Sequence, residues 1–295
     1  MLDQNLYSVD LIIPTRRGAL ALQKLFTEAA ASPEWLKHTF CLVFDATAKD
    51  HAAEFHAWLT ENKHLRFPKI RASFAPPQAT GNLNMLRAFG LTMSQNPYVY
   101  FQDDDDPLPQ GFETRIKMMR QESYDAVFGV TETRTARGQM IERFPTLDAQ
   151  GRPLYDFLQG VKLFPTYVHP CAALYRRNAV EKIKMDDGQR YNLCGIGAFL
   201  TQFLTMTTQI KVLPDIIRIG LQNRDNMSEP ILDQQQRLLL AEDISSWQKY
   251  ITDSEVRKFQ EKIRQDLIHG DIITFRDITA RVESRLEEEG YFSEE

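Results

Sequence analysis

Residues 98–110 read Tyr-Val-Tyr-Phe-Gln-Asp-Asp-Asp-Asp-Pro-Leu-Pro-Gln, and this stretch decides the fold that we expect. Its first four residues are aromatic or β-branched, which predicts a short buried strand. Four aspartates, residues 103–106, follow closely. Carboxylates crowded at the end of a buried strand repel one another, so some would take up protons unless a cation compensates them. A divalent ion such as Mg²⁺, usually held by one or two carboxylates and substrate phosphates, would do so. The alternative is a solvated turn, because Asp and Pro are common turn residues.

The chain before this stretch alternates between short apolar runs and segments with helical periodicity. Strands are predicted over 9–13, 39–44 and 69–74, and helices over 50–61 and 82–94. This alternation predicts an α/β fold with a parallel sheet between helices, which binds its ligands at the carboxyl ends of the strands. Four loops are therefore expected to meet in one crevice, those at Pro14, Asp45, Pro76 and Asp103.

The chain after the aspartates has a less regular pattern, followed by a change in composition. Three charge-rich amphipathic helices are predicted near the end, over 233–250, 254–269 and 275–289. Upstream of them the pattern predicts helices over 111–120, 178–184 and 195–206, strands over 124–131, 171–175, 210–213 and 216–221, a hairpin over 131–143, and a loop-rich region over 155–168.

Composition places the chain among globular proteins, with 295 residues, 43% hydrophobic and 25% charged. A net charge of -5 argues against a surface devoted to nucleic acid or membrane. Three cysteines, Cys41, Cys171 and Cys194, lie in apolar surroundings without a CxxC pair and are expected in the core. The N-terminus lacks a signal-peptide pattern and no window of about 18 apolar residues occurs. We therefore expect a cytoplasmic protein without a transmembrane segment.

The order of these motifs resembles the GT-A glycosyltransferases that use nucleotide sugars, and in particular the inverting family 2. The resemblance covers about residues 8–225. It rests on four landmarks, namely Val-Asp-Leu-Ile-Ile-Pro-Thr-Arg at 9–16, Leu-Val-Phe-Asp-Ala-Thr at 42–47, the residues Gly81, Arg87 and Gly90, and the strand with its Asp-x-Asp metal motif at 98–106. Where the family has Ala-Arg-Asn, Ala88 replaces the Asn.

The resemblance implies a Rossmann-like, mixed and mostly parallel sheet with a C-terminal helical appendage. It divides the chain into a GT-A domain over 1–228, with a nucleotide-sugar half (1–110) and an acceptor half (111–228), and a helical extension over 229–295. It also implies a nucleotide-sugar donor, most simply a UDP-sugar, and Mn²⁺ or Mg²⁺ as cofactor.

The resemblance also assigns residues to the donor site. Asp45 would bind the uracil. Asp103 would face the ribose and Asp105 the metal, although a shifted register would pair Asp103 with Asp104. Further donor-site residues would be Pro14, Thr15, Arg16 and Gly81, and the diphosphate would meet Arg87, Arg16 or Arg224.

Two positions depart from the family. The helix that should begin with the catalytic base carries no carboxylate, so either the general base is among Asp186, Asp187 and His169 or the enzyme transfers the sugar by a different mechanism. A metal-binding His of many relatives is also missing, and its place falls among Asn223, Asp225 and Asn226.

The acceptor is not identified by the sequence. Basic residues outnumber acidic ones over 162–225, which favours an anionic acceptor such as a lipid phosphate, a charged glycan or nucleic acid; scattered solvated charges are the alternative. Two other functions stay open. One is a nucleotidyltransferase, disfavoured by a first loop with a single glycine, and the other is a binding or scaffold protein on a decayed transferase fold.

Overall fold

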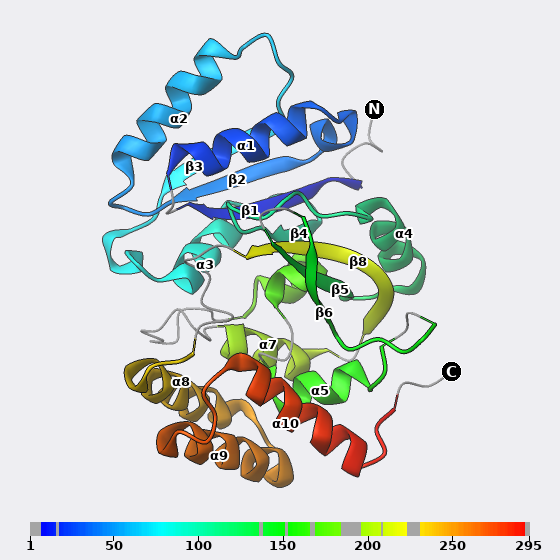
Figure 1. The fold of residues 1–295 in the computed structure, drawn as a ribbon. Helices are drawn as coiled ribbons and strands as arrows, with labels where there is room; N and C mark the ends of the chain where they lie inside the picture. Colours follow the sequence, from blue (N-terminus) through cyan, green and yellow to red (C-terminus); the bar gives the residue numbers. More distant parts are fainter. Residues whose placement is uncertain are drawn as a thin grey trace.

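One mixed sheet forms the centre of the structure, with helices packed around it (Figure 1). The computed structural model of the protein describes residues 7–15, 18–135, 138–150, 153–165, 169–183, 196–207, 209–222 and 231–292. Within these residues eight strands are paired, in the order β3-β2-β1-β4-β7-β5-β6, with β8 alongside β5. The strands are β1 (Val9–Thr15), β2 (Thr39–Phe44), β3 (Lys69–Phe74), β4 (Tyr98–Phe101), β5 (Ala126–Thr135), β6 (Met140–Phe144), β7 (Ala173–Arg176) and β8 (Ile210–Gln222).

The strand directions confirm a mixed, mostly parallel sheet. Strands β1 to β4 are parallel to one another, and β8 is parallel to β5. Strand β7 is antiparallel to both β4 and β5, and β6 closes the expected hairpin with β5. Residues of β1, β2 and β4 are buried throughout, because helices cover both faces of this part of the sheet.

Helices α1 and α2 lie on one side of the first three strands, and α3 lies on the other (Figure 1). Helix α3 begins where the Asn82 side chain accepts hydrogen bonds from the backbone N–H groups of Asn84 and Met85. The helices are α1 (Ala19–Ala30), α2 (Lys49–Glu61), α3 (Leu83–Met93), α4 (Phe112–Glu122), α5 (Phe157–Leu163), α6 (Arg177–Val180), α7 (Ile196–Met206), α8 (Gln234–Trp247), α9 (Ser254–His269) and α10 (Phe275–Glu288).

Two predicted segments were wrong. Residues 210–213 and 216–221 form the single strand β8, because Pro214 falls in a bulge where residues 213–215 lie opposite Gly129. The region predicted as loop-rich contains helix α5. Asp156 caps this helix, because its side chain accepts hydrogen bonds from the N–H groups of Leu158 and Gln159. The aromatic residues nearby obscured this capping signal in the sequence.

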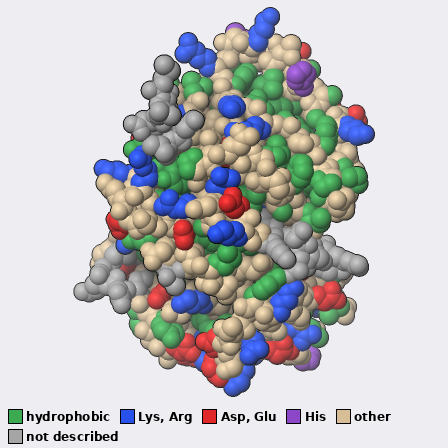
Figure 2. Space-filling view, turned by 180° about the vertical axis from the view of Figure 1, so that it is seen from behind, with side chains coloured by type: hydrophobic (Ala, Val, Ile, Leu, Met, Phe, Trp, Pro, Cys, Tyr) green, Lys and Arg blue, Asp and Glu red, His purple; other side chains and the backbone are tan. Residues whose placement is uncertain are grey.

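The three C-terminal helices were predicted correctly, and they pack against α5 and α7 (Figure 1). Trp247 is fully buried and its indole Nε1 donates to Gln260 Oε1 over 3.0 Å. The amide of Gln260 in turn donates to the carbonyl of Leu163 over 2.9 Å. A Cβ added at Gly197 would lie 2.3 Å from the Trp247 ring, so glycine is required there. The helices thus share a buried core with the sheet, while charged side chains cover their outer face (Figure 2).

The cysteines and the membrane prediction can be checked only where the chain is described. Cys41 and Cys171 are buried and unpaired, as expected, and Cys194 lies outside the described residues. Among the described helices, none combines the length and the apolar character needed to cross a membrane.

Candidate functional site

The carboxyl ends of the first four strands meet at one edge of the sheet. The N–H of Asp45 donates to the carbonyl of Thr15, and the N–H of Ala75 donates to the carbonyl of Phe44. On the other side of β1, the N–H of Gln102 donates to the carbonyl of Ile12. The loops predicted to converge therefore lie side by side, and Pro14 and Thr15 form their buried floor.

Asp45 ties two of these loops together. One oxygen of its buried carboxylate accepts hydrogen bonds from the N–H of Thr47 over 3.0 Å and from the Thr47 hydroxyl over 2.7 Å. The other accepts the N–H of Gly81 over 2.8 Å. Gly81 has φ of 77°, a left-handed conformation that favours glycine. The carboxylate thereby fixes the loop that leads into α3.

The four aspartates form a tight turn at the end of β4. The N–H of Asp106 donates to the carbonyl of Asp103 over 3.3 Å. The buried side chain of Gln102 holds this turn, because its amide donates to the carbonyls of Asp103 (2.8 Å) and Asp106 (3.0 Å). Asp104 and Asp106 are buried, and Asp103 and Asp105 are half-buried. This burial does not fit the alternative of a solvated turn.

Two arginines neutralise part of the turn. Arg87 Nη2 on α3 donates to Asp103 Oδ1 over 2.7 Å. Arg218 Nη2 on β8 lies 2.6 Å from Asp106 Oδ2 and 3.5 Å from Asp103 Oδ2. Burial raises the pKa of Asp103, but the charges of Arg87 and Arg218 outweigh burial and hold the pKa below its usual range. The sequence predicted that the crowded carboxylates need a cation. For Asp103 and Asp106, the guanidinium groups of Arg87 and Arg218 supply that positive charge.

Arg115 on α4 holds strand β8 at Asp215, close in the chain to Arg218. Its guanidinium is fully buried and donates to the carbonyls of Gln110, Gly111 and Asp215 over 3.1–3.2 Å. A Cβ at Gly129 would lie 2.3 Å from Arg115 Nη2, so the missing side chain of Gly129 makes room for the guanidinium. Because Asp215 lies three residues before Arg218 in β8, this contact fixes the strand close to the acidic turn.

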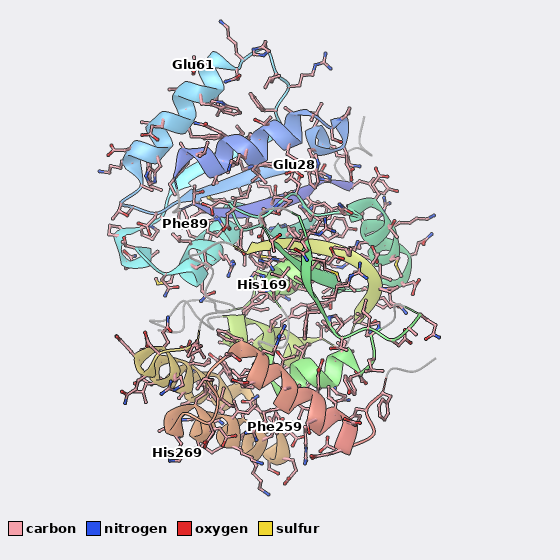
Figure 3. All side chains as sticks on the ribbon, in the orientation of Figure 1. Glu28, Glu61, Phe89, His169, Phe259 and His269 are labelled. Atoms are coloured by element: carbon pink, nitrogen blue, oxygen red, sulfur yellow. The ribbon has the colours of Figure 1, made fainter. Side chains whose placement is uncertain are left out.

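His169 lies near the middle of the molecule (Figure 3), with its Nε2 3.7 Å from Asp103 Oδ2. Its Nδ1 accepts the N–H of Cys171 over 3.2 Å. Burial, and next Arg218, lower the pKa of His169 well below its usual range, so the ring is neutral. A neutral ring that accepts at Nδ1 carries its proton on Nε2, and this N–H faces Asp103.

This tautomer bears on a possible metal site. Asp103, His169 and Cys171 offer ligand atoms within 4.8 Å of one another. A histidine that binds a metal through one nitrogen usually donates a hydrogen bond from the other, whereas Nδ1 of His169 accepts one. Burial also raises the pKa of the Cys171 thiol. Because Nδ1 of His169 accepts a hydrogen bond, this group is a poorer metal site than its spacing suggests.

Comparison with known proteins gives a result for structure alone. No protein-family model matches the chain, and no curated protein matches its sequence. Among solved structures, residues 1–349 of S. aureus TarS in complex with UDP-GlcNAc are 13% identical, with a TM-score of 0.56 over 88% of this chain and 71% of that one. A mannosyltransferase from Pyrobaculum calidifontis in complex with GDP-Man and Mn²⁺ is 14% identical, with a TM-score of 0.54 over 88% and 69%. The chain has a GT-A fold. Identities this low show the fold and no more.

Within this GT-A fold, the structure brings several of the predicted site residues together at the carboxyl ends of the strands. These are Pro14, Thr15, Asp45, Gly81, Arg87, His169 and Asp103, Asp104 and Asp105 of the turn. Four predicted residues, Arg16, Asp186, Asp187 and Asn226, lie outside the described residues, as do Arg224 and the other candidates Asn223 and Asp225.

Sequence reasoning missed Gln102 and Arg218 at these strand ends, and it did not foresee that Asp106 of the aspartate block pairs with Arg218. The signal for Arg218 was a single charge within the apolar run 216–221, which is unusual for a buried strand unless the charge has a partner. Nothing local in the sequence identifies that partner as Asp106.

Proposed function

We propose that this protein is a metal-dependent glycosyltransferase that moves a sugar from a nucleoside diphosphate sugar, most simply a UDP-sugar, to an acceptor. The observation that carries the proposal is the junction of Asp45, Gly81, Arg87 and Asp103 at the carboxyl ends of parallel strands. Such an edge is where open α/β sheets bind nucleotides. TarS with UDP-GlcNAc and the mannosyltransferase with GDP-Man have the same fold, which supports this choice of donor class.

Different residues at these strand ends would contact different parts of the donor. Pro14, Thr15 and Asp45 would face the base and ribose, together with Arg16, which is not described. Arg87 is 2% exposed and carries a permanent charge, so it would meet the diphosphate.

The turn suits a hard cation, because its side chains offer carboxylate oxygens that Mn²⁺ and Mg²⁺ prefer. Asp105 and Asp103 would hold the ion, with Asp104 as the next candidate and Asn226 from outside the described residues. When bound, the ion supplies positive charge for the departing diphosphate. Arg87, which contacts Asp103, would add to this charge.

Removal of the acceptor proton, which an inverting transfer requires, is assigned to Asp186 or Asp187. His169 is less suited to this role, because its Nδ1 is occupied and its Nε2 carries the proton. We assign His169 to donate a hydrogen bond within the donor site.

The acceptor would lie against residues 155–225. Fewer basic side chains are available to an acceptor there than a count from the sequence indicates. Arg176 donates to the carbonyls of Met119 and Tyr124, and Arg218 is paired with Asp106. These two cations are therefore already engaged by groups of the protein itself.

The test combines binding and turnover. The protein is titrated with UDP, UDP-GlcNAc and GDP-Man with and without Mn²⁺, and release of free sugar from each nucleotide sugar is followed. We expect Mn²⁺-dependent binding and slow hydrolysis of one donor. Asp105→Asn should abolish the metal-dependent part, whereas Asp271→Asn, an exposed aspartate among the C-terminal helices, should leave it unchanged.

The other outcomes identify other functions. If no nucleotide binds under any condition, the protein is a binding or scaffold protein on a GT-A fold. If a nucleoside triphosphate and a sugar phosphate react with release of pyrophosphate, the protein is a nucleotidyltransferase. If Asp105→Asn binds Mn²⁺ normally, the metal ligand lies elsewhere in the turn, with Asp104 next to be tested.

A further inference from the structure

We propose that Arg218 is a second diphosphate-binding residue beside Arg87, and that the donor and the divalent ion bind cooperatively. The ion would attract the carboxylates that hold the two arginines, and the diphosphate would attract the arginines that hold the carboxylates. In the structure Arg87 is held by Asp103 and Arg218 by Asp106. On binding, Asp103 would turn to the ion beside Asp105, Asp106 would join them as a further ligand, and both arginines would turn to the phosphates. This inference rests on the proposed function.

The first support is unused hydrogen-bonding capacity in Arg87, which is buried, and in Arg218, which is half-buried. Arg87 Nε and Nη1 and Arg218 Nε are buried and have no hydrogen-bond partner among the described residues. A guanidinium has five N–H donors in a planar fork that matches phosphate oxygens. Buried donors without partners are costly, so a site that leaves three of them is suited to a ligand rich in acceptors.

The second support is the pairing of opposite charges at this site. Two arginines face two carboxylates, Asp103 and Asp106, and burial strengthens their interaction. Arg218 faces both carboxylates, since its Nη2 lies 2.6 Å from Asp106 Oδ2 and 3.5 Å from Asp103 Oδ2. A cation that arrives alone must displace a guanidinium, and a diphosphate that arrives alone must displace a carboxylate. Each ligand alone therefore binds weakly.

Joint binding removes both penalties. The ion takes the carboxylates from the arginines, and the diphosphate takes the arginines from the carboxylates. By thermodynamic linkage, the factor by which Mn²⁺ tightens UDP binding equals the factor by which UDP tightens Mn²⁺ binding. Direct contact between ion and phosphate contributes to this factor in any such site, so the arginine contribution must be measured as the change on mutation.

The experiment is calorimetric titration of the intact protein with Mn²⁺ alone, UDP alone, and UDP at saturating Mn²⁺. In Arg218→Gln, we expect Mn²⁺ alone to bind about 10-fold more tightly, because the competing charge is gone, and UDP with Mn²⁺ to bind about 10-fold more weakly. In Asp106→Asn we expect the mirror image, with UDP alone binding about 10-fold more tightly, because Arg218 is released.

Controls separate binding effects from damage to the fold. Arg264→Gln breaks an ion pair with Glu261 on α9, outside this site, and should match the wild type in all three titrations. Because Arg218 and Asp106 are ion-pair partners, each variant is first checked for a wild-type circular dichroism spectrum. If a single variant does not fold, the pair Arg218→Gln with Asp106→Asn, which removes both charges, replaces it and should lose the arginine part of the cooperativity.

The outcomes distinguish this inference from the proposed function. If the wild type binds UDP with Mn²⁺ but Arg218→Gln changes neither Mn²⁺ affinity nor the linkage factor, the inference is overturned and the function stands. If the wild type binds no nucleotide, the function is overturned together with the diphosphate role of Arg218. Looser Mn²⁺ binding in Arg218→Gln would overturn the inference in either case.

Discussion

Arg115 Nη1 lies 2.8 Å from Asp215 Oδ2, and this ion pair ties the beginning of α4 to strand β8. The two residues differ in exposure, because the Arg115 side chain is fully buried and that of Asp215 is 48% exposed. The attraction between the two charges therefore contributes little to stability. Arg115 stabilises the structure mainly through its hydrogen bonds to three carbonyl groups.

Arg115→Met should destabilise the protein by about 3 kcal/mol, because it leaves the carbonyls of Gln110, Gly111 and Asp215 without their donor. Urea unfolding measures this change. The matched variant Asp215→Asn removes only the exposed charge and should cost less than about 1 kcal/mol. Equal losses in the two variants would show that the ion pair, and not the carbonyl contacts, holds β8.

Gly90→Ala should destabilise the protein by about 2 kcal/mol, although alanine is the better helix former. A Cβ at Gly90 would lie 2.3 Å from Ile12 Cγ2 and 3.0 Å from Val43 Cγ2, so α3 would have to move off the sheet. Arg87 is one turn away, and nucleotide affinity should fall as well. Thr92→Ala, at an exposed position of α3, is the control. A melting temperature for Gly90→Ala at or above the wild-type value would contradict the close packing.

Stability should fall as the pH drops below about 6.5 because of His38. Burial, and next Lys37, lower the pKa of this histidine from 6.5 to about 3. Between these values the unfolded chain binds a proton that the folded protein does not, so the free energy of unfolding rises with pH up to about 6.5 and is flat above it. The lowered pKa of His169 acts in the same direction.

His38→Asn isolates this effect, because the asparagine oxygen can replace Nδ1 as acceptor for the N–H of Val9. Melting temperatures from pH 4 to 8 should then depend less on pH than in the wild type. His56→Asn, on the exposed side of α2, should leave the profile unchanged. A wild-type slope in His38→Asn would mean that other groups cause the acid sensitivity.

Asp45→Asn should loosen the loop at Gly81, because an amide presents an N–H group where one carboxylate oxygen accepts a hydrogen bond. A hydrogen bond to a charged group contributes about 1.5–3 kcal/mol, so protection of the Gly81 amide from hydrogen exchange should fall by roughly 10-fold or more. Nucleotide binding should weaken with it. Thr47→Ser keeps the hydroxyl and is the control. Unchanged exchange at Gly81 would show that the loop is held by other contacts.

The sequence predicted the N-terminal half well because its signals are local. The strands at Val9, Thr39, Lys69 and Tyr98 are each followed by a loop and a helix whose apolar spacing is visible within a dozen residues. The predictions were wrong where contacts between residues far apart in the sequence decide the structure. Strand β8 continues past Pro214 only because Gly129 and Arg115 accommodate the bulge.

By itself the sequence determined that a buried strand ends in four carboxylates at the edge of a parallel sheet, since hydrophobic pattern and strand order suffice for that. Only the tertiary structure decided which cations those carboxylates meet. Arg87 reaches Asp103 from α3, and Arg218 reaches Asp106 from a strand far along the chain. The physical reason is that ion pairs depend on a few ångströms of separation between side chains, and only the pairing of β8 with β5 brings Arg218 to the turn.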